Sequence, residues 1–556
     1  MATVTAINPM GQGNTAIKRR LENRFTFLLV CSIAVAMLCS QQVVAADSDS
    51  ASAPIQNSDS TNSDNGNAAP QQAGNRKWTI TPSLGFEETY SDNIALAPRG
   101  SEKSAWVTQI NPGLSLTGAG PNLKVNASYQ MQNLFYSDKA IGQDTTYQQL
   151  NANANAKLID DFFFVDGMAS IAQQNISPLG TLAIDNINVT NNRTNIRTYS
   201  ISPYLEHRFD DIASGELRYT HGGVDTDTAG LANSQTDNIL FTLNSDTSFK
   251  TIGWGLNYNK QRISYNNNSI QFVGAAESEN YSGTLRYLVT PDLTVNATAG
   301  YEKYNYLSIG PTQEGSSLTA GFSWAPSART DIEAAAGHDS LYGPTYFLKA
   351  SYRAHRTAWT LNYTENITTT QGQFLLPTTI DTSAFLNNLW ASSIPDPAQR
   401  QQIVDAFISS NGLPNLLTEP VDYLTNQFFL QKLFQASFAI TGKGNTIMFT
   451  IFDMSGTSVI SGEALLGGNN VVYPRETGGN VLWNSQLSSR TSANISVSVF
   501  GTGAGNYLKS LTAGISRQFQ PKLRGSIILR RIQQDSDQFT VGYQEDDITA
   551  SLLMTF

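Results

Sequence analysis

Residues that could perform chemistry are sparse in this chain and do not stand at catalytic or metal-binding spacings. Its two cysteines, Cys31 and Cys39, lie near the N-terminus, which argues against a structural zinc site in the rest of the chain. None of the histidines occurs in an H-x-x-x-H or HEXXH pattern. The histidines are His207, His221, His338 and His355. We therefore predict no resident metal and no cofactor.

Nucleophilic catalysis needs a base beside a nucleophile. Only the segment Tyr219-Thr220-His221-Gly222 offers that combination, and it lies at the end of an expected strand. The glycines of 253–255 and 501–503 are not followed by a P-loop lysine, so we interpret them as strand and turn glycines. Asp92-Asn93 and Asp225–Asp227 are either calcium ligands or solvated loop carboxylates. We predict that the protein is not an enzyme, and a lipid or glycan hydrolase remains a distant alternative.

The composition indicates which elements position these residues. The chain has 556 residues, of which 14% are charged and 40% hydrophobic. Soluble domains carry about 25% charged residues. No run of 18 apolar residues appears after the N-terminus, so helical membrane spans are not expected. Low charge without long apolar runs is typical of a transmembrane β-barrel, whose strands alternate lipid-facing apolar and lumen-facing polar residues.

Alternation with period two recurs along the chain. Clear examples lie at 78–86, 123–131, 150–158, 293–301 and 548–556. We expect about 22 such segments, each of roughly 9–11 residues, which is the length that a tilted strand needs to cross a bilayer. The final segment ends on an aromatic residue, Phe556, as in the assembly signal of bacterial outer-membrane barrels.

The connections alternate between short turns, such as 118–121, 160–161 and 290–292, and long polar loops, such as 173–195 and 364–425. This is the outer-membrane pattern of periplasmic turns and extracellular loops. A soluble array of β-sandwiches would need recurring domain boundaries, and we find none. The predicted fold is all-β: a single antiparallel up-and-down transmembrane barrel of about 22 strands, with counts from 18 to 24 open.

The N-terminal segment predicts the destination of the chain. Residues 1–46 combine a basic region, an apolar run from Phe25 to Leu38 and a small-residue site at Val44-Ala45-Ala46, so they are predicted to be a signal peptide cleaved near Ala46. Residues 47–76 are a predicted disordered periplasmic linker. Residues 77–556 form the predicted barrel in the outer membrane of a Gram-negative bacterium. Without residues 1–46 the net charge is −13, which argues against a nucleic-acid partner.

The longest connection, 364–425, is predicted to contain a short helix. Asp396-Pro397 forms an N-cap and first turn, apolar residues follow at helical spacing from Ile403 to Ile408, and Gly412 ends the pattern. This helix is either a constriction or lid folded into the barrel, or a helix packed on the rim.

The polar phase of each strand is expected to face the lumen. It consists mainly of hydroxyl and amide groups with few charges, which suits water and neutral sugars, although any water-filled barrel needs polar walls. We select as lumen-lining candidates Lys124, Asn153, Arg218, Glu216, Arg286, Asn296, Lys349, Arg353, Asn362, Arg524 and Arg530.

Several segments resemble the outer-membrane barrel family associated with the PEP-CTERM/exosortase system of Gram-negative bacteria. They are WTITPSL at 78–84, ETYSDNIAL at 88–96, INPGLSL at 110–116, ISPYLEHRF at 201–209 and GPTYFLKASYRAHRTAW at 343–359. The resemblance implies a role in moving or anchoring exopolysaccharide, together with periplasmic export components. It transfers no site residues. The chain has no C-terminal Pro-Glu-Pro motif, so it does not resemble a sorting substrate of that system.

Two functions follow from these patterns. The first is a porin-like outer-membrane conduit in exopolysaccharide export. The second is a non-conducting surface scaffold or receptor barrel that anchors extracellular polymer or protein. In either case the barrel is in contact with outer-membrane lipid. A pore predicts ion conductance that falls when polymer enters, and a filled barrel predicts none.

Overall fold

The structure is a computed structural model that describes residues 78–177, 180–228, 233–246, 248–266, 275–305, 312–368, 429–458, 475–502, 506–535 and 542–556. The predicted signal peptide, the predicted linker and the predicted helix near 396–412 lie outside these residues. In the described ranges, no helix is long and apolar enough to cross a bilayer.

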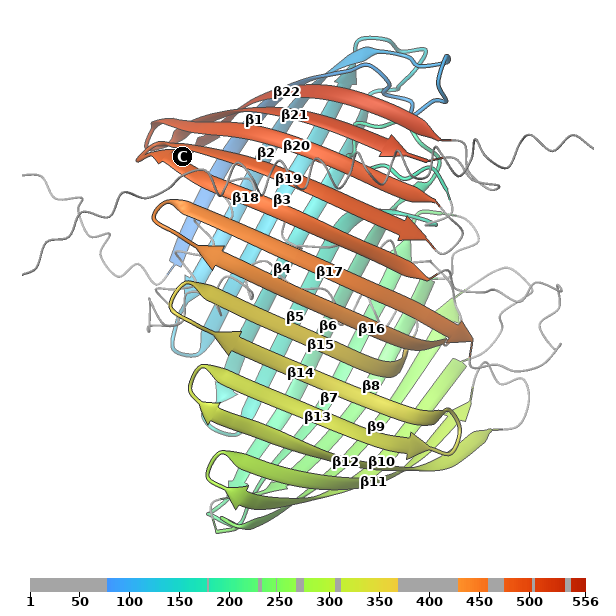
Figure 1. Cartoon of the computed structure of the whole chain (residues 1–556), viewed down its shortest axis with the longest axis vertical. Coiled ribbons are helices and arrows are strands. Elements are labelled where there is room, and N and C mark those ends of the chain that lie inside the picture. Colours follow the sequence, from blue (N-terminus) through green and yellow to red (C-terminus); the bar gives the residue numbers. More distant parts are fainter. Residues whose placement is uncertain are drawn as a thin grey trace, which may run out of the picture. The chain divides into compact units, whose positions relative to one another are not determined.

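Within these ranges, twenty-two strands form one closed antiparallel barrel (Figure 1). Each strand pairs with its neighbours in sequence, and β22 returns to pair with β1 from Ser83↔Thr555 to Ser91↔Asp547. This closure confirms the predicted all-β barrel and its strand number. The strands are β1 (Trp78–Ser91), β2 (Ala105–Ala119), β3 (Leu123–Tyr136), β4 (Thr145–Ile159), β5 (Phe163–Asn175), β6 (Arg193–Phe209), β7 (Ala213–Thr226), β8 (Asn233–Ser245), β9 (Ile252–Asn266), β10 (Ala275–Thr290), β11 (Leu293–Asn305), β12 (Gln313–Ser327), β13 (Thr330–Asp339), β14 (Gly343–Arg353), β15 (Thr357–Thr368), β16 (Phe429–Thr441), β17 (Asn445–Ser458), β18 (Glu476–Ser488), β19 (Thr491–Thr502), β20 (Tyr507–Gln520), β21 (Leu523–Gln534) and β22 (Tyr543–Thr555).

The apolar phase of the strands covers the outside of the barrel. In a strand, successive side chains point to opposite faces, and directly paired residues on neighbouring strands share a face. Large apolar residues of one face are about half exposed, which is the arrangement expected where lipid takes the place of protein packing. They include Leu84, Phe86, Leu114, Ile201, Leu217, Leu256, Leu285, Leu318, Ile451, Ile527 and Leu552. We call this the outward face.

Short turns join the strands at the end of the barrel where β1 begins and β22 ends. Asp161 and Asp210 adopt positive φ angles, 56° and 51°, in the β4–β5 and β6–β7 turns. Aspartate tolerates this left-handed conformation better than most residues do. Gly444 has a φ of 82° in the β16–β17 turn. By the general pattern of outer-membrane barrels, this short-turn end is periplasmic and the opposite end is extracellular.

Candidate functional site

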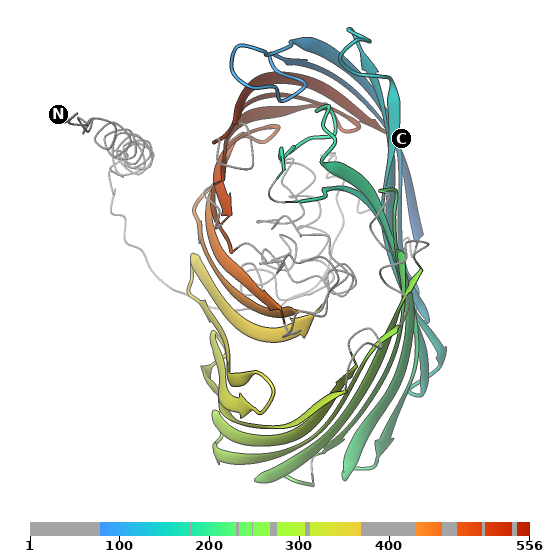
Figure 2. The ribbon, with the colours of Figure 1, turned by 90° about the vertical axis from the view of Figure 1, so that its right-hand side faces the viewer.

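The connection between β5 and β6 spans residues 176–192, and we call it the inner loop. Its described part, which omits residues 178–179, lies inside the ring of strands (Figure 2, teal). It contacts the polar phase of the strands near their extracellular ends, so that phase is the lumenal face. Ile176 N–H donates to the Asn192 carbonyl at 2.9 Å, which closes the base of the loop.

Side chains shape the inner loop where backbone pairing is missing. The Asn175 amide accepts from Ala183 N–H and donates to the Ala183 carbonyl, both at 3.1 Å. The Asn192 amide donates to the carbonyls of Ser177 and Thr181, at 2.8 and 3.1 Å. Asparagine side chains carry the same donor and acceptor as a peptide group, so they replace backbone partners in irregular segments.

One end of the inner loop is held by the last two strands. Leu182 N–H donates to Gln534 Oε1 of β21 at 2.9 Å, and Gln534 Nε2 donates to the Gly180 carbonyl at 3.0 Å. The Tyr543 hydroxyl of β22 donates to the Leu182 carbonyl. Gln534, Leu182 and Tyr543 are at most 2% exposed. These bonds are therefore shielded from competing water.

The other end is held by β3, β5 and the β1–β2 loop. The Tyr136 hydroxyl donates to the Ile187 carbonyl at 2.8 Å. Asn186 Nδ2 donates to Gln132 at 2.6 Å and to Gln173 at 3.1 Å. Val189 N–H donates to the carbonyl of Ile94 at 2.9 Å. The loop is thus fixed along its length by several strands and not by its two ends alone.

Two apolar clusters lie under the inner loop, inside the barrel. The first is Ile94, Ala105, Val107, Leu134, Tyr136 and Ile187. The second is Leu96, Ala183, Ile532 and Tyr543. Ile94, Leu134, Ile187 and Ile532 are fully buried. Burial of a large aliphatic side chain contributes about 1.5–3 kcal/mol, so these clusters supply much of the free energy that keeps the loop in the lumen.

Charged groups complete the contact between the inner loop and the wall. Glu545 on β22 is fully buried; it accepts from Asn188 Nδ2 at 2.8 and 3.0 Å and from the Ser91 hydroxyl. Arg530 on β21 donates to Asp547 at 2.7 Å and to Asp185 of the loop at 3.2 Å. Buried charges persist only when paired or hydrogen-bonded, and here the loop supplies some of the partners.

A short loop beside this contact has its own electrostatic anchor. Asp144, which precedes β4, accepts a hydrogen bond from the Tyr136 backbone N–H at 3.1 Å and pairs with Lys139. The hydrogen bond from the Lys139 ammonium holds the pKa of Asp144 below its usual range. The Asp144 carboxylate therefore stays ionised at neutral pH and keeps the end of β3 in place beside the inner loop.

The pairing register places all of the predicted lumen-lining residues on the face that carries the inner loop. Of these, Arg530 donates a hydrogen bond to the loop, to Asp185 at 3.2 Å. Two predicted pairs are cross-strand partners, Arg286↔Asn296 and Lys349↔Asn362. The others on this face are Lys124, Asn153, Arg218, Glu216, Arg353 and Arg524.

Arg218 forms a second charged cluster on the lumenal face. Its guanidinium donates to Glu216 at 2.6 Å and to Asp166 at 2.8 Å, and it lies 3.7 Å from the centre of the Tyr204 ring. A planar guanidinium can serve two carboxylates and an aromatic face at once. The cluster therefore ties β5, β6 and β7 together, and much of its charge is neutralised within the wall.

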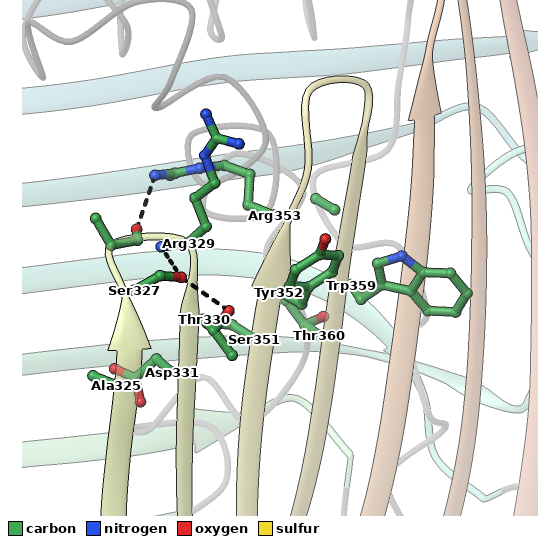
Figure 3. Close-up of a pocket in the computed structure, with 12 residues that line it drawn as sticks. Ala325, Ser327, Arg329, Thr330, Asp331, Ser351, Tyr352, Arg353, Trp359 and Thr360 are labelled. Carbon is green, nitrogen blue, oxygen red and sulfur yellow. Dashed lines mark hydrogen bonds between the residues drawn. The ribbon is translucent and has the colours of Figure 1, made fainter. Parts of the chain in front are cut away.

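Arg353 lies at the periplasmic end, in a pocket between the β12–β13 and β14–β15 turns (Figure 3). It donates to the Ala328 carbonyl at 3.3 Å, and the Ser327 hydroxyl lies 3.2 Å from both Thr330 Oγ1 and Arg329 N. These contacts stabilise the turns. We assign no ligand to this pocket.

The histidine segment that the sequence singled out faces outward on β7. His221 Nδ1 lies 2.8 Å from Asp237 Oδ1, which also accepts from the Tyr219 hydroxyl at 2.6 Å. Its direct cross-strand neighbours are Ile201 and Asp237. The arrangement is a carboxylate that binds a histidine and a tyrosine.

The acidic segments considered as calcium ligands have protein partners. Asp227 accepts from Arg197 at 2.7 Å and from Asn195 at 2.6 Å, and the Asn93 amide bonds to the carbonyls of Ala97 and Gln544. Within the ranges that the structure describes, no group of three or more His, Cys, Asp or Glu side chains could hold a metal ion.

Burial varies strongly over the lumenal wall. On β16, Gln431, Gln435, Ser437 and Ala439 are nearly or fully buried, whereas Asn153 and the neighbouring asparagines of β4 are exposed. An empty water-filled pore would expose its wall all round. Sequence reasoning missed the inner loop, although Leu182 and Ile187 within a polar connection were a signal for it.

The chain matches no protein-family model and no curated protein. Its barrel is similar to solved structures at low identity. These include the siderophore receptor PirA from Pseudomonas aeruginosa (11% identity, TM-score 0.40, 86% of this chain and 80% of that chain). Another is the F3-3 variant of the FrpB iron transporter from Neisseria meningitidis (9%, 0.47, 87% and 82%). A third is the siderophore receptor PiuA from Acinetobacter baumannii (8%, 0.44, 85% and 82%). At these identities and TM-scores, the likeness supports no conclusion about what this protein binds or transports.

Proposed function

We propose that this protein is an outer-membrane receptor or scaffold barrel that anchors extracellular polymer or protein and does not conduct at rest. The observation that carries the proposal is the inner loop, held in the lumen by buried hydrogen bonds and two apolar clusters. A segment bound this firmly reduces the free cross-section near the extracellular mouth.

The position of the loop also supports a binding role at the cell surface. It bonds to the β1–β2 loop through Ile94 and to the extracellular ends of β21 and β22 through Gln534 and Tyr543. Extracellular connections are therefore organised around one rigid centre. Binding sites are commonly built on loops that a rigid scaffold positions.

A second candidate is a conduit for exopolysaccharide, with periplasmic export components as partners, as the PEP-CTERM/exosortase resemblance implies. Pairs of hydroxyl groups on the lumenal face favour it, such as Ser526 with Ser551 at 2.6 Å and Thr284 with Thr298 at 2.8 Å. Uncharged donors and acceptors suit the hydroxyl groups of sugars.

The two candidates differ in conductance. We would refold the chain from Asp47 onwards and record single channels in a planar bilayer, beside a variant in which 177–191 is replaced by a short Gly-Ser linker. A receptor or scaffold predicts silence from the intact barrel and steady conductance from the variant. Steady conductance of the intact protein, blocked by added exopolysaccharide, would overturn the proposal and support the conduit.

The control keeps the inner loop and replaces lumenal Asn153 by Ala, which removes one exposed amide of the wall. The control should behave as the intact chain does. Silence in every version, from protein shown to be folded by its β-sheet circular dichroism, would mean that the inner loop is not what closes the barrel.

A further inference from the structure

One seam of the barrel is only half paired. Strands β14 and β15 pair from Leu348↔Tyr363 to Arg353↔Ala358, at the periplasmic end. In the described part of the chain, no pairing joins Gly343–Phe347 to Thr364–Thr368, although both segments are extended. Their other edges are paired, with β13 and β16. Figure 2 shows β15, in yellow, apart from the yellow-green end of β14. We call this opening the notch.

The notch lies at the level of the outer leaflet. Glu365 is eight residues above the start of β15 at Thr357. At about 3.4 Å per residue and a tilt near 40°, that is roughly 20 Å above the periplasmic end of the strand. The apolar band of such barrels is about 25 Å tall. The notch therefore begins within the upper part of the band and opens toward the cell surface.

A buried carboxylate bridges the notch. The Glu365 side chain is 1% exposed; it accepts from the backbone N–H of Tyr346 on β14 at 3.3 Å and from the Tyr363 hydroxyl. Lys432 on β16 donates to the same carboxylate at 3.1 Å. Backbone groups cannot be left unsatisfied in lipid, so a side chain takes over where the ladder stops. A side-chain bond is easier to exchange than a strand ladder.

The groups around the notch define what could pass. The Lys432 side chain is 39% exposed, so its ammonium can be reached from outside the barrel. Tyr346 is half exposed on the outward face, beside the apolar band. Lumenal Asn366 on β15 is exposed on the other side. An anionic group could replace Glu365 at Lys432 while an apolar chain stays in the lipid.

We propose that the notch is a lateral passage between the lumen and the outer leaflet for an amphiphile with an anionic headgroup. In the closed state Glu365 bridges the two strands and pairs with Lys432. An incoming anionic headgroup replaces Glu365 as the partner of Lys432. This inference does not depend on the proposed receptor or scaffold role, because the notch lies away from the inner loop in the strand order.

The first test uses brominated lipids and a fluorescent label. The chain from Asp47 onwards contains no cysteine, so a bimane can be placed at Asn366→Cys in the notch or at lumenal Thr319→Cys, a position of β12 that pairs with both β11 and β13. The barrel is reconstituted with brominated phosphatidylglycerol or brominated phosphatidylcholine. We expect at least twofold stronger quenching at residue 366 than at residue 319, greatest with phosphatidylglycerol. Lys432→Gln should abolish the headgroup preference.

Equal quenching at residues 366 and 319 in both lipids would overturn the passage. Stronger quenching at residue 366 that is the same in both lipids would overturn the anionic headgroup.

A second test asks whether the notch exists in the folded barrel. The pair Thr345→Cys/Asn366→Cys continues the β14–β15 register across the notch, and the matched pair Ser351→Cys/Thr360→Cys lies in the paired half. Copper-catalysed oxidation should form the matched disulfide at least tenfold faster. Equal rates in folded protein would show a closed ladder and overturn the proposal.

Discussion

The side-chain amide of Asn188 donates to both carboxylate oxygens of Glu545, at 2.8 and 3.0 Å, across 357 residues of sequence. Asn188 belongs to the inner loop and Glu545 to the last strand. Both side chains are nearly or fully buried, beside the two apolar clusters under the loop. The placement of the inner loop and the closure of the barrel are therefore coupled, and the coupling can be tested.

Asn188→Leu removes the uncharged side-chain amide that donates hydrogen bonds to both carboxylate oxygens of Glu545. The Ser91 hydroxyl still donates to Oε1, so Oε2 is the buried acceptor left without this donor, at a cost of about 1–3 kcal/mol. If the loop closes the barrel, we expect a five- to hundredfold increase in the frequency of single-channel openings. Asn153→Leu, on the exposed part of the wall, is the control and should leave that frequency unchanged. An unchanged opening frequency in the Asn188 variant would mean that the bond to Glu545 does not hold the loop in the lumen.

Tyr136→Phe deletes the hydroxyl that bonds to the Ile187 carbonyl and leaves the ring in its apolar cluster. The expected cost is about 1 kcal/mol, because one hydrogen bond is lost and one buried acceptor is left unpaired. Hydrogen–deuterium exchange of the peptide covering 180–192 should become roughly fivefold faster. Tyr129→Phe, on the other face of β3, should not alter it; equal acceleration by both variants would argue for a general loosening of the strand.

Arg218→Leu leaves Asp166 and Glu216 on the lumenal wall without their shared cation. The three side chains are about a quarter exposed, so screening reduces the penalty below that of a fully buried pair, and we expect a loss of about 1–3 kcal/mol. Urea unfolding in detergent measures it. Arg218→Lys should recover only part of the loss, because one ammonium nitrogen replaces two guanidinium nitrogens that reach separate carboxylates, and it cannot stack flat on the Tyr204 ring. Full recovery would mean that the planar shape of the guanidinium is not needed.

Leu285 and Thr284 are neighbours on β10 that point to opposite sides of the wall. Leu285 is 65% exposed on the outward face, and the Thr284 hydroxyl bonds to that of Thr298 in the lumen. Arginine at a lipid-facing position near the middle of the membrane costs about 2–4 kcal/mol. Leu285→Arg should therefore lower the free energy of unfolding in bilayers by that amount, and Thr284→Arg by less than half as much. The reverse order would invert the assignment of the faces.

The barrel could be predicted from sequence because its strands repeat a local pattern. In segments such as 123–131 and 293–301, apolar and polar residues alternate because one face of the strand meets lipid and the other meets water. Each strand can therefore be recognised from its own sequence, without knowledge of its neighbours. The same alternation placed Arg218 and Arg530 on the lumenal face. Their partners were not predictable, because Asp166 and Asp547 are brought to them by the register between strands.

The inner loop could not be predicted for a related reason. Its polar composition resembles that of a surface loop, and its partners Tyr136, Gln534 and Glu545 are distant in sequence. The sequence instead drew attention to 364–425 as a possible constriction, and nearly all of that connection lies outside the described residues. Buried contacts between irregular segments leave no periodic signal.

The pairing of β22 with β1 has a consequence for biogenesis. Both edges of the sheet remain unsatisfied until Tyr543–Thr555 reaches the first strand, so every shorter nascent product carries open hydrogen-bonding edges. Such edges can pair with strands of other chains. The ring of strands therefore closes only when the first and the last strand are both present, so a chain truncated before β22 cannot form this barrel.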